Sequence, residues 1–155
     1  MIRKAKKTDA DAIMGLLFQV ASVHNEGRPD IFKPNTTKYT KSELEKMIED
    51  EEKIVFVYED ENSDILAHAF CEMIVHEGDN LLADMRTLYI DDICVDEKAR
   101  GRRIGKEIYE HVISFAKETR CHNVTLNVWE CNENAKKFYE AMGMKVQKTG
   151  METLL

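Results

Sequence analysis

Residues 95–106 read Val-Asp-Glu-Lys-Ala-Arg-Gly-Arg-Arg-Ile-Gly-Lys, and the rest of the chain can be organised around them. The apolar run at residues 89–95 that leads into them is typical of a strand. Ile104, Ile108 and Val112 then recur at helical spacing. A basic loop that contains glycine therefore connects a strand to the first turn of a helix. The unpaired N–H groups of such a turn carry partial positive charge, and glycine lets a phosphate approach the backbone. The stretch predicts an anion site.

The charge of this loop is opposite to that of the whole chain. The formal net charge of the protein is −7, yet five basic side chains gather here: Lys98, Arg100, Arg102, Arg103 and Lys106. The sequence lacks both G-x-x-x-x-G-K-[ST] and G-x-G-x-x-G, which excludes a P-loop NTPase and a Rossmann dinucleotide turn. Two interpretations remain, a phosphate loop of another kind or a basic turn that only faces solvent.

A second stretch follows one helix later, at residues 126–144. It combines an apolar run with Asn132-x-x-Ala135-x-x-Phe138-Tyr139 and Gly143-Met144. Taken with residues 100–105, it resembles the two cofactor segments of the GNAT N-acetyltransferases, Q/R-x-x-G-x-G/A and N-x-x-A-x-x-F-Y-x-x-x-G-F. Arg103 stands where that family usually has its first motif glycine, which leaves open how closely the backbone can approach a phosphate there.

The resemblance implies a cofactor and the residues that bind it. In the family, backbone N–H groups of the loop hold the pyrophosphate of acetyl-CoA, and CoA is the product. The backbone of Cys94 and Val95 is then expected to contact the pantetheine arm and the reacting carbonyl oxygen, and Asn134 is a candidate helix cap. The cofactor residues implied are Ile93, Cys94, Val95, Arg100, Gly101, Arg102, Arg103, Ile104, Gly105, Lys106, Asn127, Asn132, Asn134, Ala135, Phe138 and Tyr139.

The order of expected elements indicates a single α/β or α+β domain over residues 1–155. Strands are expected at 2–5, 53–58, 65–75, 89–95 and 123–129, and helices from 8, 40, 104 and 134. Both prolines fall between residues 22 and 38, which predicts an irregular connection. The apolar stretch at 151–155 could complete the sheet or pair with a second copy in a homodimer. The resemblance adds a mixed, mostly antiparallel, splayed sheet flanked by helices.

Two adjacent carboxylates, Asp91 and Asp92, interrupt the apolar strand before the loop. Strands are depleted in Asp, and successive side chains face opposite sides, so only one of the two is expected to face any one cleft. The segment resembles the Y-[LI]-E-D of diamine and polyamine acetyltransferases. By that match Asp91 is the candidate base that deprotonates an amine, and Asp92 orients the substrate ammonium. The alternative is that one of the two is a solvated edge residue or pairs with a basic neighbour for structural reasons.

Tyr139 is the candidate general acid. An amine must lose a proton to attack, because its pKa is near ~10.4, and the leaving thiolate can gain one. The resemblance places Tyr139 where the family protonates the CoA sulfur. Its spacing with Ala135, Phe138 and Met142 also fits a helix face that is simply buried.

Composition and the remaining motifs restrict the other classes. No apolar run reaches the ~20 residues of a membrane helix, and the N-terminus does not resemble a signal peptide. Four cysteines without a C-x-x-C pair suit free thiols in a cytoplasmic protein. The histidines show no ligand spacing, so no metal is expected. The negative charge argues against a nucleic-acid partner.

The leading hypothesis is acetyl-CoA-dependent N-acetylation of a small cationic primary amine. His24 is a candidate substrate contact, since it lies in the region that forms the acceptor wall in the family. Two alternatives stay open: acetylation of a protein or peptide amine, and an acyl-CoA-binding module without catalysis.

Overall fold

The computed structural model describes residues 1–155, which form one sheet and four α-helices. The strands are β1 (Ile2–Lys4), β2 (Ile54–Glu59), β3 (Ile65–His76), β4 (Met85–Val95) and β5 (Asn123–Leu126). The helices are α1 (Ala10–Gly27), α2 (Lys41–Glu49), α3 (Ile104–Glu118) and α4 (Glu133–Ala141). Two short 3-10 helices are η1 (Lys7–Asp9) and η2 (Glu97–Ala99).

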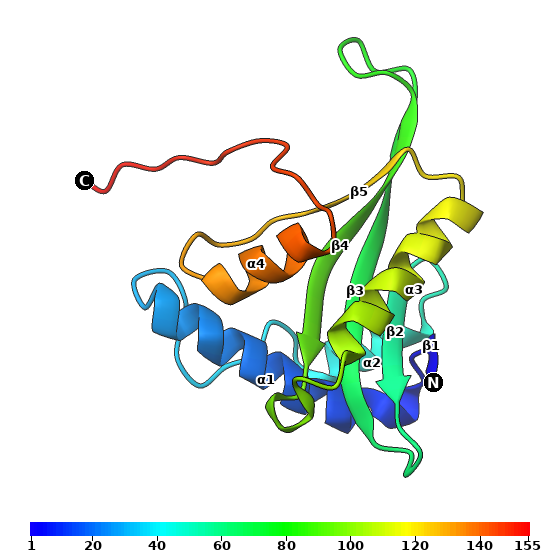
Figure 1. The fold of residues 1–155 in the computed structure, drawn as a ribbon, viewed down its shortest axis with the longest axis vertical. Coiled ribbons are helices and arrows are strands. Elements are labelled where there is room, and N and C mark those ends of the chain that lie inside the picture. The colour runs from blue at the N-terminus through cyan, green and yellow to red at the C-terminus, as the bar shows by residue number, and fades with distance from the viewer.

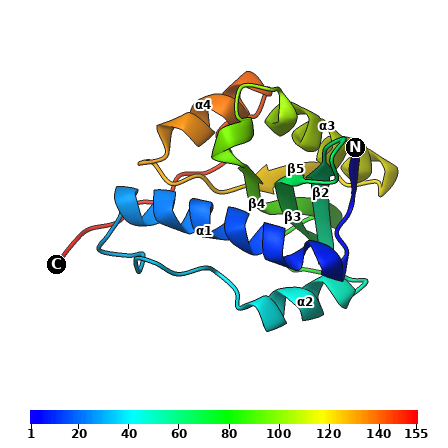
Figure 2. The same cartoon turned by 90° about the horizontal axis from the view of Figure 1, so that it is seen from below.

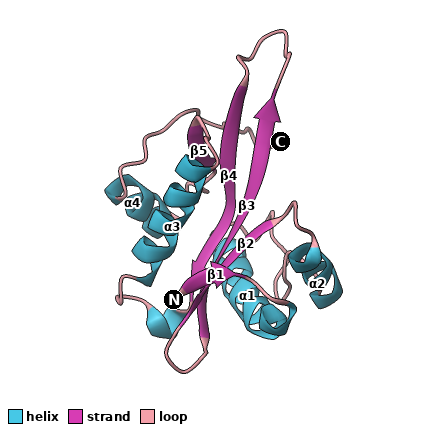
Figure 3. Ribbon diagram, turned by 90° about the vertical axis from the view of Figure 1, so that its right-hand side faces the viewer, coloured by secondary structure: helices cyan, strands magenta, loops and turns pink.

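The strands lie in the order β1-β2-β3-β4-β5. The first three pairs are antiparallel and β4 pairs with β5 in parallel, which confirms the expected mixed, mostly antiparallel sheet. Helices cover both faces: α3 and α4 lie on one side of the sheet, and α1 and α2 on the other (Figures 1, 2 and 3). No helix is both long and apolar enough to cross a membrane.

The alternation of side chains in β2 shows how the sheet joins two cores. Ile54 and Phe56 belong to the apolar cluster under α3, whereas Val55 and Val57 belong to the cluster under α1 and α2. Because successive strand residues face opposite sides, an uninterrupted apolar run is required where both faces are covered. The sequence 54–57 meets that requirement, and all four residues are buried.

One of the two N-terminal helices follows the sequence expectation and the other extends beyond it. The capping box of α2 is confirmed: Thr40 N–H donates to Glu43 at 2.8 Å, and Glu43 N–H donates to Thr40 Oγ1 at 3.3 Å. The irregular connection, however, was expected from residue 22, and α1 instead continues to Gly27. Its last turn lies close to Cys131 in the loop before α4, and local propensity does not encode such a contact.

The C-terminal strands were predicted too long. Strand β5 ends at Leu126 rather than at 129, because β4 and β5 separate there and residues 127–129 have no ladder partner. The expected strand at 151–155 is wrong, since the chain beyond Gly143 has no regular structure and leaves the body of the molecule (Figure 1). Met151 and Leu155 are fully exposed. Pairing of this segment with a second copy stays a prediction.

Candidate active site

The basic loop ends in a turn that leaves the start of α3 open. Arg103 is the residue before the helix and adopts the left-handed conformation, with φ +65°. No side chain caps this helix, so its first N–H groups remain available for an external acceptor. A non-glycine residue at positive φ costs about 1 kcal/mol, which explains why a glycine is common at this point of the motif. Gly101 also has positive φ, +79°.

The arginines of the loop have no carboxylate partners. Arg100, Arg102 and Arg103 form no salt bridge, and Lys106 lies 3.7 Å from Glu110 on the next turn of α3. Free guanidinium groups beside an uncapped helix N-terminus make an electrostatically positive surface in an acidic protein. This local arrangement fits a diphosphate.

Gly105 brings three elements together. A Cβ on this residue would lie 3.4 Å from Val95 Cγ2 and 3.5 Å from the Phe138 ring, so β4, α3 and α4 approach closely at this point. Ile104 is 2% exposed and belongs to the core, so only its backbone could contact a ligand. The small residue in the motif is thus needed for packing as well as for ligand access.

The sheet opens between β4 and β5. Their pairing stops at Ile90 and Leu126, after which β4 continues to Val95 while residues 127–132 turn toward α4. Asp96 N–H donates to Leu66 O on β3 at 2.8 Å. Because N–H groups alternate along a strand, the N–H of Val95 points the other way, into the opening. The N–H of Cys94 points to β3.

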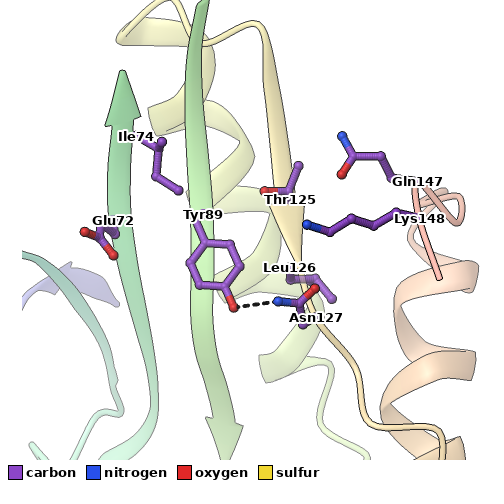
Figure 4. A pocket seen from close by; sticks show the side chains of 8 residues that line it. All are labelled: Glu72, Ile74, Tyr89, Thr125, Leu126, Asn127, Gln147 and Lys148. Carbon is purple, nitrogen blue, oxygen red and sulfur yellow. Dashed lines mark hydrogen bonds between the residues drawn. The ribbon is translucent and has the colours of Figure 1, made fainter. Parts of the chain in front are cut away.

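A pocket lies beside this opening (Figure 4). Asn127 Nδ2 donates to Tyr89 Oη at 3.2 Å across it. Its walls are Glu72, Ile74, Tyr89, Thr125, Leu126, Asn127, Gln147 and Lys148. The carboxylates of β4 do not line this pocket, so Asn127 is separated from them.

Asn132 caps α4, and Asn134 does not. Asn132 Oδ1 accepts from Ala135 N–H at 3.1 Å, and Asn132 is the residue before the first helical turn. Asn134 lies inside the helix, so its expected role as cap is wrong. The side-chain oxygen of Asn132 is engaged by this hydrogen bond, and a cofactor contact from it stays a prediction.

A bulge places both carboxylates on the same side of β4. In the β3–β4 ladder Phe70 pairs with Asp92 while Cys71 pairs with Ile90, so Asp91 is the extra residue. Paired residues of antiparallel strands share a face, which puts Asp92 with Phe70 on the α1/α2 side. Asp91 also contacts that side, through the connection between α1 and α2. The expectation that only one of the two would face a given cleft is wrong, because it assumed regular alternation.

Asp91 binds an alkylammonium group of the chain itself. Lys38 Nζ lies 2.7 Å from Asp91 Oδ1 and 2.5 Å from Oδ2, and Tyr39 Oη is 3.4 Å from Oδ2. Burial acts to lower the pKa of Lys38, but its hydrogen bond to Asp91 and the attraction of that carboxylate outweigh burial and leave the pKa raised. Lys38 therefore stays protonated at neutral pH.

Asp92 is held by a buried histidine. His68 Nε2 lies 2.7 Å from Asp92 Oδ2, and His68 is 0% exposed. A carboxylate only accepts hydrogen bonds, so Nε2 carries the proton. His68 Nδ1 is buried without a hydrogen-bond partner. In the neutral ring Nδ1 carries no hydrogen, so no buried N–H group is left without an acceptor.

Tyr139 is a protonated phenol at the edge of the α3 core. Burial raises the pKa of Tyr139 far above its usual range, and the charge of Asp92 adds to the rise, followed by Tyr109 and Cys71. The ring packs 6.2 Å from Tyr109, between centroids. A phenol in this state can donate a proton or a hydrogen bond but does not act as a base at neutral pH.

Aromatic rings from the last turns of α1 and from two loops contact one another on the acceptor side. His24 stacks on Phe32 with centroids 5.0 Å apart, and Phe32 meets the edge of Trp129 at 5.1 Å. Burial lowers the pKa of His24. The negative charge of Asp92 acts to raise this pKa, and the positive charge of Lys38 lowers it further. A Cβ on Gly27 would lie 2.6 Å from Cys131 Sγ, so α1 and the β5–α4 loop are in close contact.

Sequence reasoning missed several of these residues. Three of them lie in connections, which have no regular hydrophobic repeat from which burial could be predicted: Lys38, Phe32 and Trp129. His68 was examined only for metal-ligand spacing. The available signal was a single histidine within an apolar strand, which in that position needs a polar partner.

The comparisons with known proteins agree on one family. The acetyltransferase (GNAT) family model matches residues 20–144. A glucosamine 6-phosphate N-acetyltransferase of Arabidopsis thaliana is 31% identical over 61% of this chain and 60% of its own length. The peptidyl-lysine N-acetyltransferase YjaB of Escherichia coli is 38% identical over 37% of this chain and 36% of its own length. This chain thus covers less than two thirds of the length of each of these curated relatives. A solved mutant of the BH1408 protein of Bacillus halodurans superposes with TM-score 0.95, at 34% identity, over 100% of this chain and 99% of that one.

Proposed function

The chain belongs to the acetyltransferase (GNAT) family, and on that premise we propose that it transfers an acetyl group from acetyl-CoA to a small cationic primary amine. The donor follows from the family and from the fit of the loop. The acceptor class follows from the carboxylates of β4.

The residues around the α3 N-terminus suit the diphosphate of acetyl-CoA. The uncapped first turn of α3 would bind phosphate oxygens through backbone N–H groups, and Arg100, Arg102 and Arg103 would neutralise their charge. Val95 would contribute its N–H within the opening between β4 and β5. When bound, acetyl-CoA supplies an activated acetyl group as a thioester.

The observation that carries the acceptor class is the pair of carboxylates on one side of the β4 bulge. Asp91 already holds an alkylammonium group at hydrogen-bond distance. Asp92 adds a second negative charge, fixed by His68. We further propose that the aromatic rings of Phe32 and Trp129, which contact each other edge to face, contribute to binding of the cation. A cationic amine would be bound by charge and by stacking together.

The proposed chemistry uses two side chains of opposite role. Asp91 takes the proton from the acceptor ammonium, directly or through a water molecule, so that the nitrogen lone pair can attack. Tyr139 gives a proton to the departing sulfur, consistent with a pKa raised by burial. Fixed N–H donors such as that of Val95 stabilise negative charge on the carbonyl oxygen.

A second acceptor, a lysine side chain of a peptide, is favoured by a specific observation. The amine that occupies Asp91 here is itself a lysine side chain of a polypeptide. Small amines and peptidyl lysine present the same alkylammonium to the site. They differ in the groups attached to the amine, which the rings of His24, Phe32 and Trp129 would have to accommodate.

The test is CoA release from acetyl-CoA across diamines, polyamines, amino acids, aminoglycosides and lysine peptides. Wild type is compared with Tyr139→Phe and with Tyr58→Phe, a tyrosine of β2, which lies two strands away from β4. Turnover of small amines that falls only in Tyr139→Phe supports the proposal. Turnover restricted to peptides would mean that the acceptor is a peptide lysine and not a small amine. Binding of acetyl-CoA without turnover of any amine would mean that the protein is a non-catalytic binding module.

A further inference from the structure

Lys38 occupies the position that the proposed mechanism reserves for the acceptor amine. Its Nζ contacts both oxygens of Asp91, at 2.7 and 2.5 Å. The other lysine ion pairs lie on the helical surface or in loops, for example Lys41 with Asp11 at 2.6 Å and Lys7 with Glu49 at 3.0 Å. Lys38 is the lysine whose partner is a carboxylate of the β4 bulge.

Stability does not account for this contact. The side chain of Lys38 is 51% exposed and that of Asp91 is 27% exposed. An ion pair with that exposure contributes about 0–1 kcal/mol. The contact nevertheless spans 53 residues of sequence and holds the α1–α2 connection at the opening of the site. Such a weak and reversible contact leaves the amine free to move toward a bound thioester.

We propose that Lys38 is an acetylation site of this protein, modified within the same molecule by its own active site. The inference rests on the proposed function, because it needs acetyl-CoA as donor and Asp91 as base. It extends that function to an internal acceptor.

The step balances as an ordinary acyl transfer. The Lys38 ammonium gives one proton to Asp91, and the freed Nζ lone pair forms a bond to the acetyl carbon. The attacking nitrogen then gives up its second proton, and the bond from the acetyl carbon to sulfur breaks with its electron pair going to sulfur. The sulfur takes a proton from Tyr139, the second proton of the nitrogen restores that phenol, and Asp91 later releases its proton to solvent. The products are Nζ-acetyl-Lys38 and CoA, with one proton released to solvent overall. No oxidant or further reactant is needed.

Acetylation would also change the acceptor site. The amide of acetyl-Lys38 carries no charge, so it cannot keep the ion pair with Asp91. The carboxylate is then free to bind an external ammonium. After acetylation of Lys38, the Asp91 carboxylate would therefore be more accessible to an external amine than before.

The experiment incubates the purified protein with acetyl-CoA alone and locates acetyl groups by peptide mass spectrometry over time. Acetylation of Lys38 is expected first, at a first-order rate that does not change on dilution of the protein. Lys41 is the matched control, because it lies three residues away with 49% exposure and no contact with the site. Equal rates at Lys38 and Lys41 would mean uncatalysed chemistry and would overturn the proposal.

Two variants and one parallel assay separate the causes. Asp91→Asn should slow acetylation of Lys38 by about 100-fold, since a positioned base contributes about 10²–10⁴-fold, while Lys41→Arg should leave it unchanged. A rate proportional to protein concentration would show transfer between molecules and would contradict the internal reaction. CoA release with small amines is followed in parallel, so turnover of amines without modification of Lys38 overturns this inference and leaves the proposed function standing.

Discussion

The two halves of the candidate site are built in different ways. The half proposed to bind the phosphates of acetyl-CoA, called the phosphate side below, is one continuous stretch from Val95 to Lys106. Its proposed hydrogen-bond donors are largely backbone N–H groups at the start of α3. The acceptor side is made of side chains from distant segments, with Lys38, His68 and Asp92 contributed by a connection and by two strands. The first half depends on local conformation, and the second depends on how strands and loops are brought together. Substitutions should therefore affect the two halves independently.

The largest effect is expected from Asp91→Asn. The variant keeps shape but removes the proposed base, and turnover with a small amine should fall by about 100-fold or more. Acetyl-CoA affinity, measured by calorimetry, should change less than twofold because the phosphate side is untouched. Asp64→Asn, in the β2–β3 turn, is the control. Unchanged turnover in Asp91→Asn would remove Asp91 from the mechanism.

A smaller effect on turnover is expected from substitution of Tyr139, the proposed acid. Tyr139→Phe should lower kcat by about 10-fold, which is below the usual contribution of about 10²–10⁴-fold for a positioned acid, because a thiolate already leaves readily. Burial, then the charge of Asp92, raises the pKa of Tyr139 well above the ordinary value near 10. The phenol therefore stays protonated as pH rises to about 10, and the alkaline limb of the rate profile below that pH should be the same in both proteins. A limb that moves in the variant would contradict this assignment.

His68→Leu tests the acceptor side through stability. Loss of the buried partner leaves Asp92 without its hydrogen bond, and the free energy of unfolding should fall by about 2 kcal/mol. His68→Gln retains an N–H donor and should recover part of that loss together with part of the amine KM. His122→Leu, at an exposed histidine, should change stability by less than about 0.5 kcal/mol in urea unfolding. Equal KM values in wild type and His68→Leu would show that His68 does not position Asp92 for substrate.

The smallest effect is expected on the phosphate side. Arg103→Gly relieves the left-handed backbone at φ +65° and should stabilise the fold by up to about 1 kcal/mol. If the Arg103 side chain also contacts phosphate, acetyl-CoA affinity should fall by a few-fold. Arg102→Gly removes the same charge without relieving a positive φ and is the matched control. A destabilised Arg103→Gly would mean that the side chain, and not the turn, matters for folding.

Local patterns predicted most of the fold. The strand-loop-helix order around residues 95–106 and the capping box at Thr40 were confirmed. The failures lie where one element depends on another. Strand β5 ends early because β4 diverges from it, and the segment at 151–155 has no partner strand in the chain.

The sequence by itself determined the strand, basic loop and helix start that we propose as the phosphate side, because these need only a short run of residues with the right backbone freedom and charge. It also identified the two carboxylates of β4 as unusual. Tertiary structure alone decided where they point, through a bulge that appears only when β4 pairs with β3. It also supplied their partners, Lys38 and His68, from 53 and 24 residues away. Contacts at that separation arise from packing of whole elements, which no local pattern records.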